Sequence, residues 1–162
     1  MQKSLRTDDD IERVMKQYAD LVYRVAFSQT QNKNDADDVF QEVFLRYIKR
    51  NSAFESEEHE KAWLIRVTIN CSKKLWNSAW FRHTVAFDQE LVFEMPEEND
   101  ISNALSQLPS IYRSVIHLFY YEDMSVAQIS DVLGMKESTV RTRLTRAREL
   151  LRTKLKGEFD YV

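Results

Sequence analysis

The scarcity of glycine and proline is the feature that most narrows the folds open to this chain. The 162 residues include only two Gly and two Pro, whereas all-β folds need many tight turns and usually use more of both. Hydrophobic residues make up 43 % of the chain, which is enough for globular cores. The sequence therefore predicts an all-α fold.

Apolar residues recur at helical spacing in three segments of the N-terminal half. The first stripe runs from Ile11 to Val25, a second helix is predicted over about 35–50, and a third over about 60–78. Residues 51–60 are polar and acidic, and they predict a loop.

The character of the chain changes between Thr84 and Asp100. Six acidic residues occur there without Lys or Arg, and no helical or strand period survives. This composition predicts a flexible acidic linker over residues 84–100. The linker joins two small helical domains, residues 1–83 and residues 101–162.

The C-terminal domain ends in the pattern of a helix-turn-helix. Ser125–Leu133 predicts a short helix, Gly134 the turn, and Glu137 to about Lys156 a long second helix. Two further helices, over about 101–108 and 111–121, are expected before it. On a helical wheel, one face of the long helix is apolar and is expected to pack on the core. That face holds Val140, Leu144, Ala147 and Leu151.

The opposite face of the long helix is suited to DNA. Arg pairs bidentately with guanine, and Thr can hydrogen-bond a base or touch a thymine methyl. Hydroxyls at a helix start, with the N-terminal amides, favour phosphate. Residues 136–156 carry a local charge of +6 in a chain whose net charge is −3. A solvated, Arg-rich surface helix is the alternative, but the glycine turn and the hydroxyl start favour DNA binding. The predicted DNA-binding residues are Ser138, Thr139, Arg141, Thr142, Arg143, Thr145, Arg146 and Arg148.

The predicted third helix carries a polar, basic strip made of Arg66, Asn70, Lys73, Lys74 and Asn77. Such a strip fits either a nucleic-acid contact or the solvated face of an amphipathic helix. Spacing alone does not decide between the two interpretations.

Aromatic residues of the same region are able to stack on unpaired bases. Their positions favour a core role for Trp63 and Trp76, which lie within the helix. Trp80 and Phe81 lie at its end and are expected to be exposed.

The sequence offers little for catalysis, metal binding or membrane insertion. Cys71 stands alone, and none of the three His residues lies at a metal-ligand spacing. Glu42, His59 and His117 are the conceivable acid–base groups, but no nucleophile or phosphate loop accompanies them. No signal peptide or membrane span is expected. We therefore expect a cytoplasmic protein that is not an enzyme and has no cofactor or metal.

Three motifs resemble those of bacterial sigma factors. Residues 35–47 (DADDVFQEVFLRY) are similar to the polymerase-binding helix of that family, and residues 62–70 (AWLIRVTIN) to its minus-10 helix. Leu108-Pro109, residues 124–129 and residues 134–151 resemble its minus-35 domain. The order and spacing of the motifs, over roughly residues 11–156, resemble the extracytoplasmic-function (ECF) subfamily.

The resemblance implies a sigma factor that directs promoter-specific transcription initiation in response to stress or another signal. Its implied partners are the β′ coiled coil of core RNA polymerase, promoter DNA and an anti-sigma factor. The loop 51–60 matches the region that captures a flipped base, and the linker would lie in polymerase channels. The implied polymerase-binding residues are Asp38, Gln41, Glu42 and Phe44. The minus-10 candidates are Trp63, Arg66, Asn70, Lys73 and Lys74.

A different class of protein shares the C-terminal pattern. A stand-alone helix-turn-helix regulator with an N-terminal sensing domain would bind duplex DNA without polymerase. The helix over residues 35–47 disfavours this alternative, because such a regulator does not need a polymerase-binding pattern.

Overall fold

The described part of the chain is built from helices that form two compact units. The computed structural model describes residues 8–77 and 100–159, which contain no strand. The chain divides between Phe93 and Glu94. The all-α prediction is confirmed, whereas residues 84–99 of the predicted linker lie outside the described residues. None of the described helices is long and apolar enough to span a membrane.

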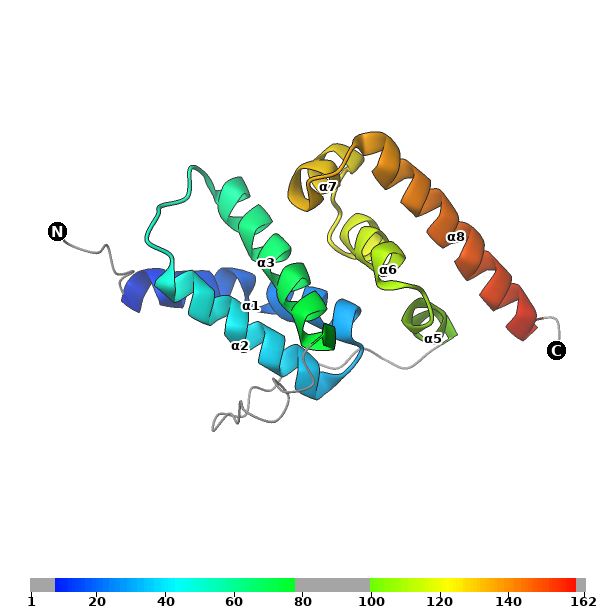
Figure 1. Ribbon diagram of the computed structural model, residues 1–162, viewed down its shortest axis with the longest axis horizontal. Helices are drawn as coiled ribbons and strands as arrows, with labels where there is room; N and C mark the ends of the chain where they lie inside the picture. The colour runs from blue at the N-terminus through cyan, green and yellow to red at the C-terminus, as the bar shows by residue number, and fades with distance from the viewer. Residues whose placement is uncertain (1–7, 78–99, 160–162) are drawn as a thin grey trace. The chain divides into compact units, whose positions relative to one another are not determined.

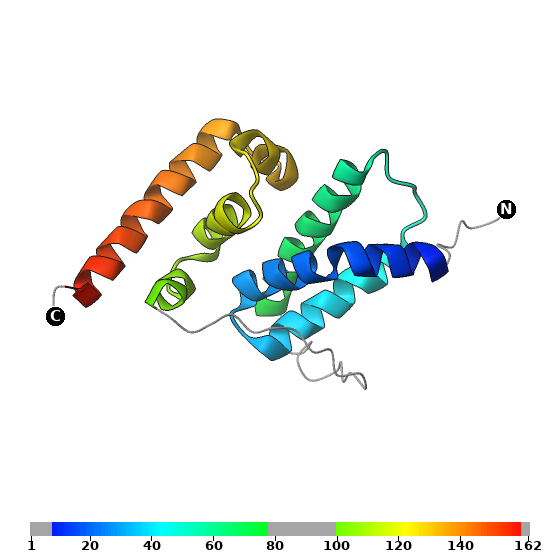
Figure 2. The same cartoon turned by 180° about the vertical axis from the view of Figure 1, so that it is seen from behind.

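Three helices that all contact one another make up the first unit (Figure 1). They are α1 (Asp8–Thr30), α2 (Lys33–Lys49) and α3 (Glu57–Asn77). Each helix buries an apolar stripe against the other two, and Figure 2 shows the same crossing from behind. The side chains completely buried between them include Val14, Val22, Val25, Val39, Val43, Tyr47, Leu64 and Ile65.

Helix α2 begins two residues earlier than the sequence pattern predicts. Asn32 is its N-cap, and the Asn32 side-chain oxygen accepts a hydrogen bond of 3.1 Å from the backbone N–H of Asp35. Asn is a favoured cap because it satisfies one of the N–H groups that a helix start leaves unpaired. The predicted start at Asp35 therefore corresponds to the capped first turn.

Helix α3 also begins earlier than predicted, at Glu57 instead of about residue 60. The acidic run that suggested a loop lies in the first turn of the helix, where the helix dipole stabilises negative charge. Ser56 caps this turn, because its hydroxyl oxygen accepts from the backbone N–H of His59 at 3.1 Å. The loop is therefore short and runs from Arg50 to Ser56.

A buried carboxylate ties the three helices of the first unit together. Glu60 of α3 is 5 % exposed. The two terminal guanidinium nitrogens of Arg13 in α1 donate hydrogen bonds to the two carboxylate oxygens of Glu60, each at 3.2 Å. The hydroxyl of Tyr47 in α2 donates to Glu60 Oε2 at 3.0 Å. A bidentate partner and a further donor compensate this charge for its removal from water.

The second unit follows the predicted order of helices with one difference in geometry. Its elements are α5 (Asp100–Ser106), α6 (Ser110–Ile116), η1 (His117–Tyr121), α7 (Val126–Leu133) and α8 (Glu137–Phe159). The helix predicted over 111–121 is α-helical only to Ile116 and then widens into a π-turn, in which Glu122 N donates to His117 O at 3.2 Å. The wide turn brings His117 Nε2 within 2.8 Å of Glu122 Oε2, a contact that helical periodicity does not reveal.

The helix-turn-helix is confirmed, and both ends of its first helix are capped. The Ser125 hydroxyl accepts from Gln128 N at 3.1 Å, while the Gln128 side chain accepts from Ser125 N at 2.9 Å. This reciprocal pair is a capping box. At the other end, Gly134 adopts the left-handed conformation (φ 64°, ψ 39°) that ends α7. The chain then enters α8 at Glu137.

Candidate nucleic-acid interface

Helix α8 separates a buried apolar face from an exposed basic face. Val140, Leu144 and Ala147 are at most 2 % exposed, which confirms the predicted packing face for these three residues, and Leu151 is half-buried. The residues that the sequence assigns to base reading are all exposed: Arg141, Thr142, Thr145 and Arg146. An exposed helix of this kind fits the major groove of DNA.

The hydroxyl groups near the start of α8 are not equivalent. Ser138 is exposed and Thr139 is half-buried. The Thr142 hydroxyl donates its hydrogen to Ser138 O at 2.9 Å. Thr142 therefore presents a methyl group and oxygen lone pairs to a partner, a combination that suits a thymine methyl or a base amino group.

The two flanking arginines also differ. Arg143 is half-buried, whereas Arg148 is exposed. Arg148 Nε donates to the Tyr120 hydroxyl at 2.7 Å, and its guanidinium carbon lies 5.6 Å from the ring centroids of both Phe119 and Tyr120. This anchoring to η1 fixes the direction of the Arg148 side chain, and its terminal nitrogens remain the groups suited to phosphate.

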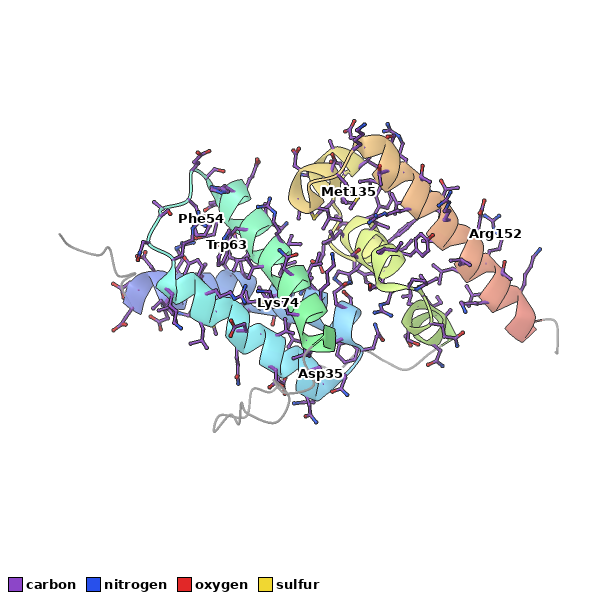
Figure 3. The ribbon with its side chains drawn as sticks, viewed as in Figure 1. Asp35, Phe54, Trp63, Lys74, Met135 and Arg152 are labelled. Carbon is purple, nitrogen blue, oxygen red and sulfur yellow. The ribbon has the colours of Figure 1, made fainter. Side chains whose placement is uncertain are left out.

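Helix α3 presents four residues of the predicted polar strip to solvent, whereas the side chain of the fifth, Asn77, lies outside the described residues. Arg66, Asn70, Lys73 and Lys74 are all exposed, and Figure 3 shows Lys74 near the end of the helix. The opposite face is buried, and two of its polar side chains form hydrogen bonds within the helix. Thr68 donates to Leu64 O at 2.6 Å, and Ser72 donates to Thr68 O at 2.8 Å.

Of the four aromatic residues assigned from the sequence, the structure describes the side chain of Trp63. Trp63 is half-buried, and its ring lies 5.6 Å from the Phe54 ring and 6.2 Å from that of Tyr47. Trp80 and Phe81 lie outside the described residues, as does the side-chain environment of Trp76. Trp63 therefore contributes to packing while retaining some accessible surface.

The residues predicted to bind polymerase do not form one exposed patch. Gln41 and Phe44 are each 7 % exposed, and the Phe44 ring packs 4.7 Å from that of Phe40. Asp38 and Glu42 are more accessible, and Glu42 accepts a 2.8 Å hydrogen bond from Arg46. The accessible carboxylates of Asp38 and Glu42 thus lie on α2, and the buried side chains of Gln41 and Phe44 pack the same helix against the core.

Asp38 has an unusual protonation equilibrium. Partial burial is the main cause that raises the pKa of its carboxyl group to about 6, and the negative charges of Asp35 and Asp37 contribute to the same rise. A carboxyl group of this kind is ionised at neutral pH but is readily neutralised under mild acidity. Figure 3 shows Asp35 at the start of the same helix.

Sequence reasoning missed a cluster around the loop that joins α2 to α3. The Arg50 guanidinium carbon lies 4.3 Å from the Phe54 ring centroid and 5.3 Å from that of Trp63. Phe54 is the one large apolar residue of the polar stretch 51–56. That exception to a polar loop is the signal that points to a packed cluster.

The conceivable acid–base groups are not assembled into a catalytic site. Glu42 pairs with Arg46, the His59 ring accepts from Glu55 N at 3.1 Å, and His117 contacts Glu122. Within residues 8–77 and 100–159, no group of His, Cys, Asp and Glu is arranged to hold a metal ion. Burial raises the pKa of the Cys71 thiol, which disfavours the reactive thiolate.

Two family models match the two units in order. The model for sigma-70 region 2 matches residues 14–82, and the model for sigma-70 region 4 matches residues 98–151. Together they cover most of the chain, including α2, α3 and the helix-turn-helix.

Individual relatives agree with the family models. The RNA polymerase sigma factor SigV of Bacillus subtilis is 30 % identical over 141 residues, which cover 84 % of this chain and 85 % of SigV. The ECF RNA polymerase sigma factor SigL of Mycobacterium tuberculosis is 34 % identical over 150 residues, which cover 86 % of this chain and 85 % of SigL.

Two solved structures share the fold at low sequence identity. CnrH, in complex with the cytosolic domain of CnrY, gives a TM-score of 0.70 at 21 % identity and covers 94 % of this chain and 91 % of CnrH. RpoE of Bartonella quintana, in complex with the anti-sigma factor NepR, gives a TM-score of 0.67 at 20 % identity. The match covers 91 % of this chain and 98 % of RpoE.

The fold and the basic face of α8 define a helical protein of the DNA-binding helix-turn-helix class. The matched regions and relatives narrow this class further: the chain belongs to the sigma-70 family, within the ECF RNA polymerase sigma factors.

Proposed function

We propose that this chain directs core RNA polymerase to promoters by reading two DNA elements. The exposed basic face of α8, backed by its buried apolar face, is the observation that carries the proposal. Residues of that face read the minus-35 element in the major groove. The chain acts by binding, in the cytoplasm, and it needs neither a cofactor nor a metal.

The minus-35 contacts divide between bases and backbone. Arg141, Thr142, Thr145 and Arg146 are exposed where a recognition helix meets base edges. Ser138, Thr139, Arg143 and Arg148 flank them and contact phosphates, which fixes the register of the helix without reading sequence. A local charge of +6 over residues 136–156 draws this part of an acidic chain to DNA.

The first unit reads the minus-10 element as a single strand. An exposed cationic strip on α3 follows the phosphate backbone of the DNA strand. It consists of Arg66, Asn70, Lys73 and Lys74, with Trp63 at its start. Extruding a base costs a few kcal/mol, so contacts of this strip and of the loop before α3 must offset that cost. Binding energy is in this way converted into DNA opening.

The first unit also holds the polymerase. Asp38 and Glu42 supply accessible negative charge on α2, which suits a cationic surface of the β′ coiled coil. Gln41 and Phe44 are buried and support the helix from the core side. Electrostatic pairing of this kind governs orientation and rate of association more than affinity.

An anti-sigma factor is the second proposed protein partner. RpoE of Bartonella quintana is seen bound to the anti-sigma factor NepR, and CnrH is seen bound to the cytosolic domain of CnrY. In the second unit, an apolar groove of about 570 Å³ has Tyr120 and Tyr121 in its lining, which also includes the basic residues Arg148, Arg152 and Lys156. An apolar helix with acidic side chains complements this groove. Co-purification with the product of the adjacent gene tests this partner.

A mobility-shift comparison with and without core polymerase tests the proposed function. The sigma factor should give promoter-specific complexes only together with core polymerase, whereas a stand-alone regulator would bind duplex DNA tightly without it. The Asp38→Arg variant should weaken core binding about tenfold through charge reversal. Asp20→Arg makes the same change at an exposed position of α1 and is the matched control. Unchanged core binding by Asp38→Arg would show the proposed grip to be wrong.

A further inference from the structure

The loop between α2 and α3 is braced by stacked side chains. Arg50, the residue that ends α2, places its guanidinium carbon 4.3 Å from the ring centroid of Phe54 and 5.3 Å from that of Trp63. Figure 3 shows Phe54 beside Trp63, where the loop meets the start of α3. A planar guanidinium over an aromatic ring is a favourable cation–π arrangement.

Phe54 also contacts rings from both helices that flank the loop. Its ring centroid lies 5.6 Å from that of Trp63 and 5.3 Å from that of His59 in α3. It lies 5.9 Å from the ring of Tyr47 in α2, with the two planes 13° apart. Edge-to-face and offset-parallel pairs at these separations are attractive. One side chain therefore connects the middle of the loop to the end of α2 and the start of α3.

Hydrogen bonds fix the backbone on both sides of Phe54. Arg50 Nε donates to Ser52 O at 3.2 Å, and Glu55 N donates to His59 Nδ1 at 3.1 Å. Between these bonds, Asn51, Ser52 and Ala53 are exposed. A short exposed segment is thus held between a stacked cation and a bonded turn.

We propose that Arg50 and Phe54 are positioning residues for minus-10 recognition, which hold residues 51–53 ready to receive an unpaired base. The proposal rests on the proposed function and deepens it. A loop that is already ordered loses little conformational freedom when DNA binds. Because this entropy cost is avoided, the affinity for DNA is higher. Neither residue is assigned a base contact; each acts through the segment that it holds.

Affinity for two DNA probes separates positioning from general support of the fold. The first probe is a fluorescent single strand carrying the non-template minus-10 element of a promoter mapped with the parental chain. The second is a duplex carrying the minus-35 element of that promoter. The holoenzymes compared contain the parental chain or one of the variants Phe54→Leu, Phe54→Tyr and Arg50→Met. Lys49→Met is the matched control, because it removes an exposed positive charge from the residue that precedes Arg50 in the chain.

Phe54→Leu and Arg50→Met should each weaken single-strand binding about tenfold, while core and duplex affinities change by less than about twofold. Phe54→Tyr, which keeps the ring, and Lys49→Met should bind like the parental chain. The proposal is overturned if both test variants bind the single strand normally. It is also overturned if both probes weaken equally, which would indicate a structural role alone. A parental chain that fails to bind core polymerase would instead refute the proposed function.

Discussion

At the scale of single residues, Asp38 is proposed to contact polymerase, and its ionised side chain lowers the stability of the fold. Its pKa is about 6 in the folded chain against an ordinary value of 3.8, chiefly because burial disfavours the carboxylate. The folded chain therefore binds the proton more tightly than the unfolded chain does. Ionised Asp38 destabilises the fold, and such local cost is common where a surface serves binding instead of stability.

Replacing Asp38 by Asn should remove part of the pH dependence of stability. Between pH 3.8 and about 6 the folded chain holds the extra proton, so the free energy of unfolding falls as the pH rises through this range. In Asp38→Asn this fall should be smaller, and the variant should be more stable than the parental chain above the range. Urea denaturation at pH values on both sides of the range measures the difference. Asp20→Asn is the control, and an unaltered pH slope in Asp38→Asn would contradict the assignment.

The hydroxyl of Tyr47 should contribute measurably to the stability of the first unit. It donates at 3.0 Å to Glu60, a carboxylate that is 5 % exposed. Removing a hydrogen bond to a charged group costs roughly 1.5–3 kcal/mol. Tyr47→Phe should lower the free energy of unfolding by about this amount in urea denaturation. Tyr121→Phe, at a side chain that is 56 % exposed, is the matched control and should change it little. Equal stability of the two variants would show that solvent replaces the Tyr47 bond.

At the scale of elements, the turn of the helix-turn-helix depends on the backbone of Gly134. Its φ of 64° lies in the left-handed region, and a Cβ placed there meets no atom within 4 Å. The cost of Gly134→Ala is therefore conformational, about 1 kcal/mol or slightly more. Gly134→Asn should cost less, because Asn tolerates this conformation. Denaturation of the second unit followed by circular dichroism measures both, and equal loss in the two variants would contradict this account.

The two kinds of arginine on α8 should have separable effects on promoter binding. Arg143→Ala should weaken holoenzyme binding to all duplexes and reduce the salt dependence by about one unit of slope. Arg141→Ala should cost roughly 1–3 kcal/mol on the cognate minus-35 element alone. Titrations of cognate and scrambled duplexes at several salt concentrations measure both effects. Identical behaviour of the two variants would contradict the division into backbone and base contacts.

Periodicity predicted the helices because each one buries a single apolar stripe, as Val140 and Leu144 do in α8. It placed the start of α3 too late, because acidic residues resemble a loop in composition even where a helix dipole favours them. The π-turn at His117 and the stack of Arg50 on Phe54 escaped prediction for a different reason. Both involve specific side-chain contacts, such as the 2.8 Å contact from His117 to Glu122, that a pattern of apolar and polar positions does not contain.

At the scale of the whole molecule, the proposed DNA binding uses an uneven distribution of charge. The chain has a net charge of −3, yet residues 136–156 carry +6. A net negative charge opposes binding to nonspecific DNA, so we expect the chain alone to bind such DNA weakly. In the proposed function, polymerase supplies the remaining attraction, and the assembled holoenzyme recognises the promoter.

Run-off transcription with purified core polymerase tests the central claim most directly. We expect discrete transcripts from a subset of genomic fragments when core polymerase and this chain are both present. Asp38→Arg should reduce their amount by weakening assembly, and Arg141→Ala should reduce it by weakening minus-35 recognition. The contradicting result has two parts. No discrete transcripts appear with the parental chain although the core polymerase is active, and the chain binds duplex DNA stably without polymerase.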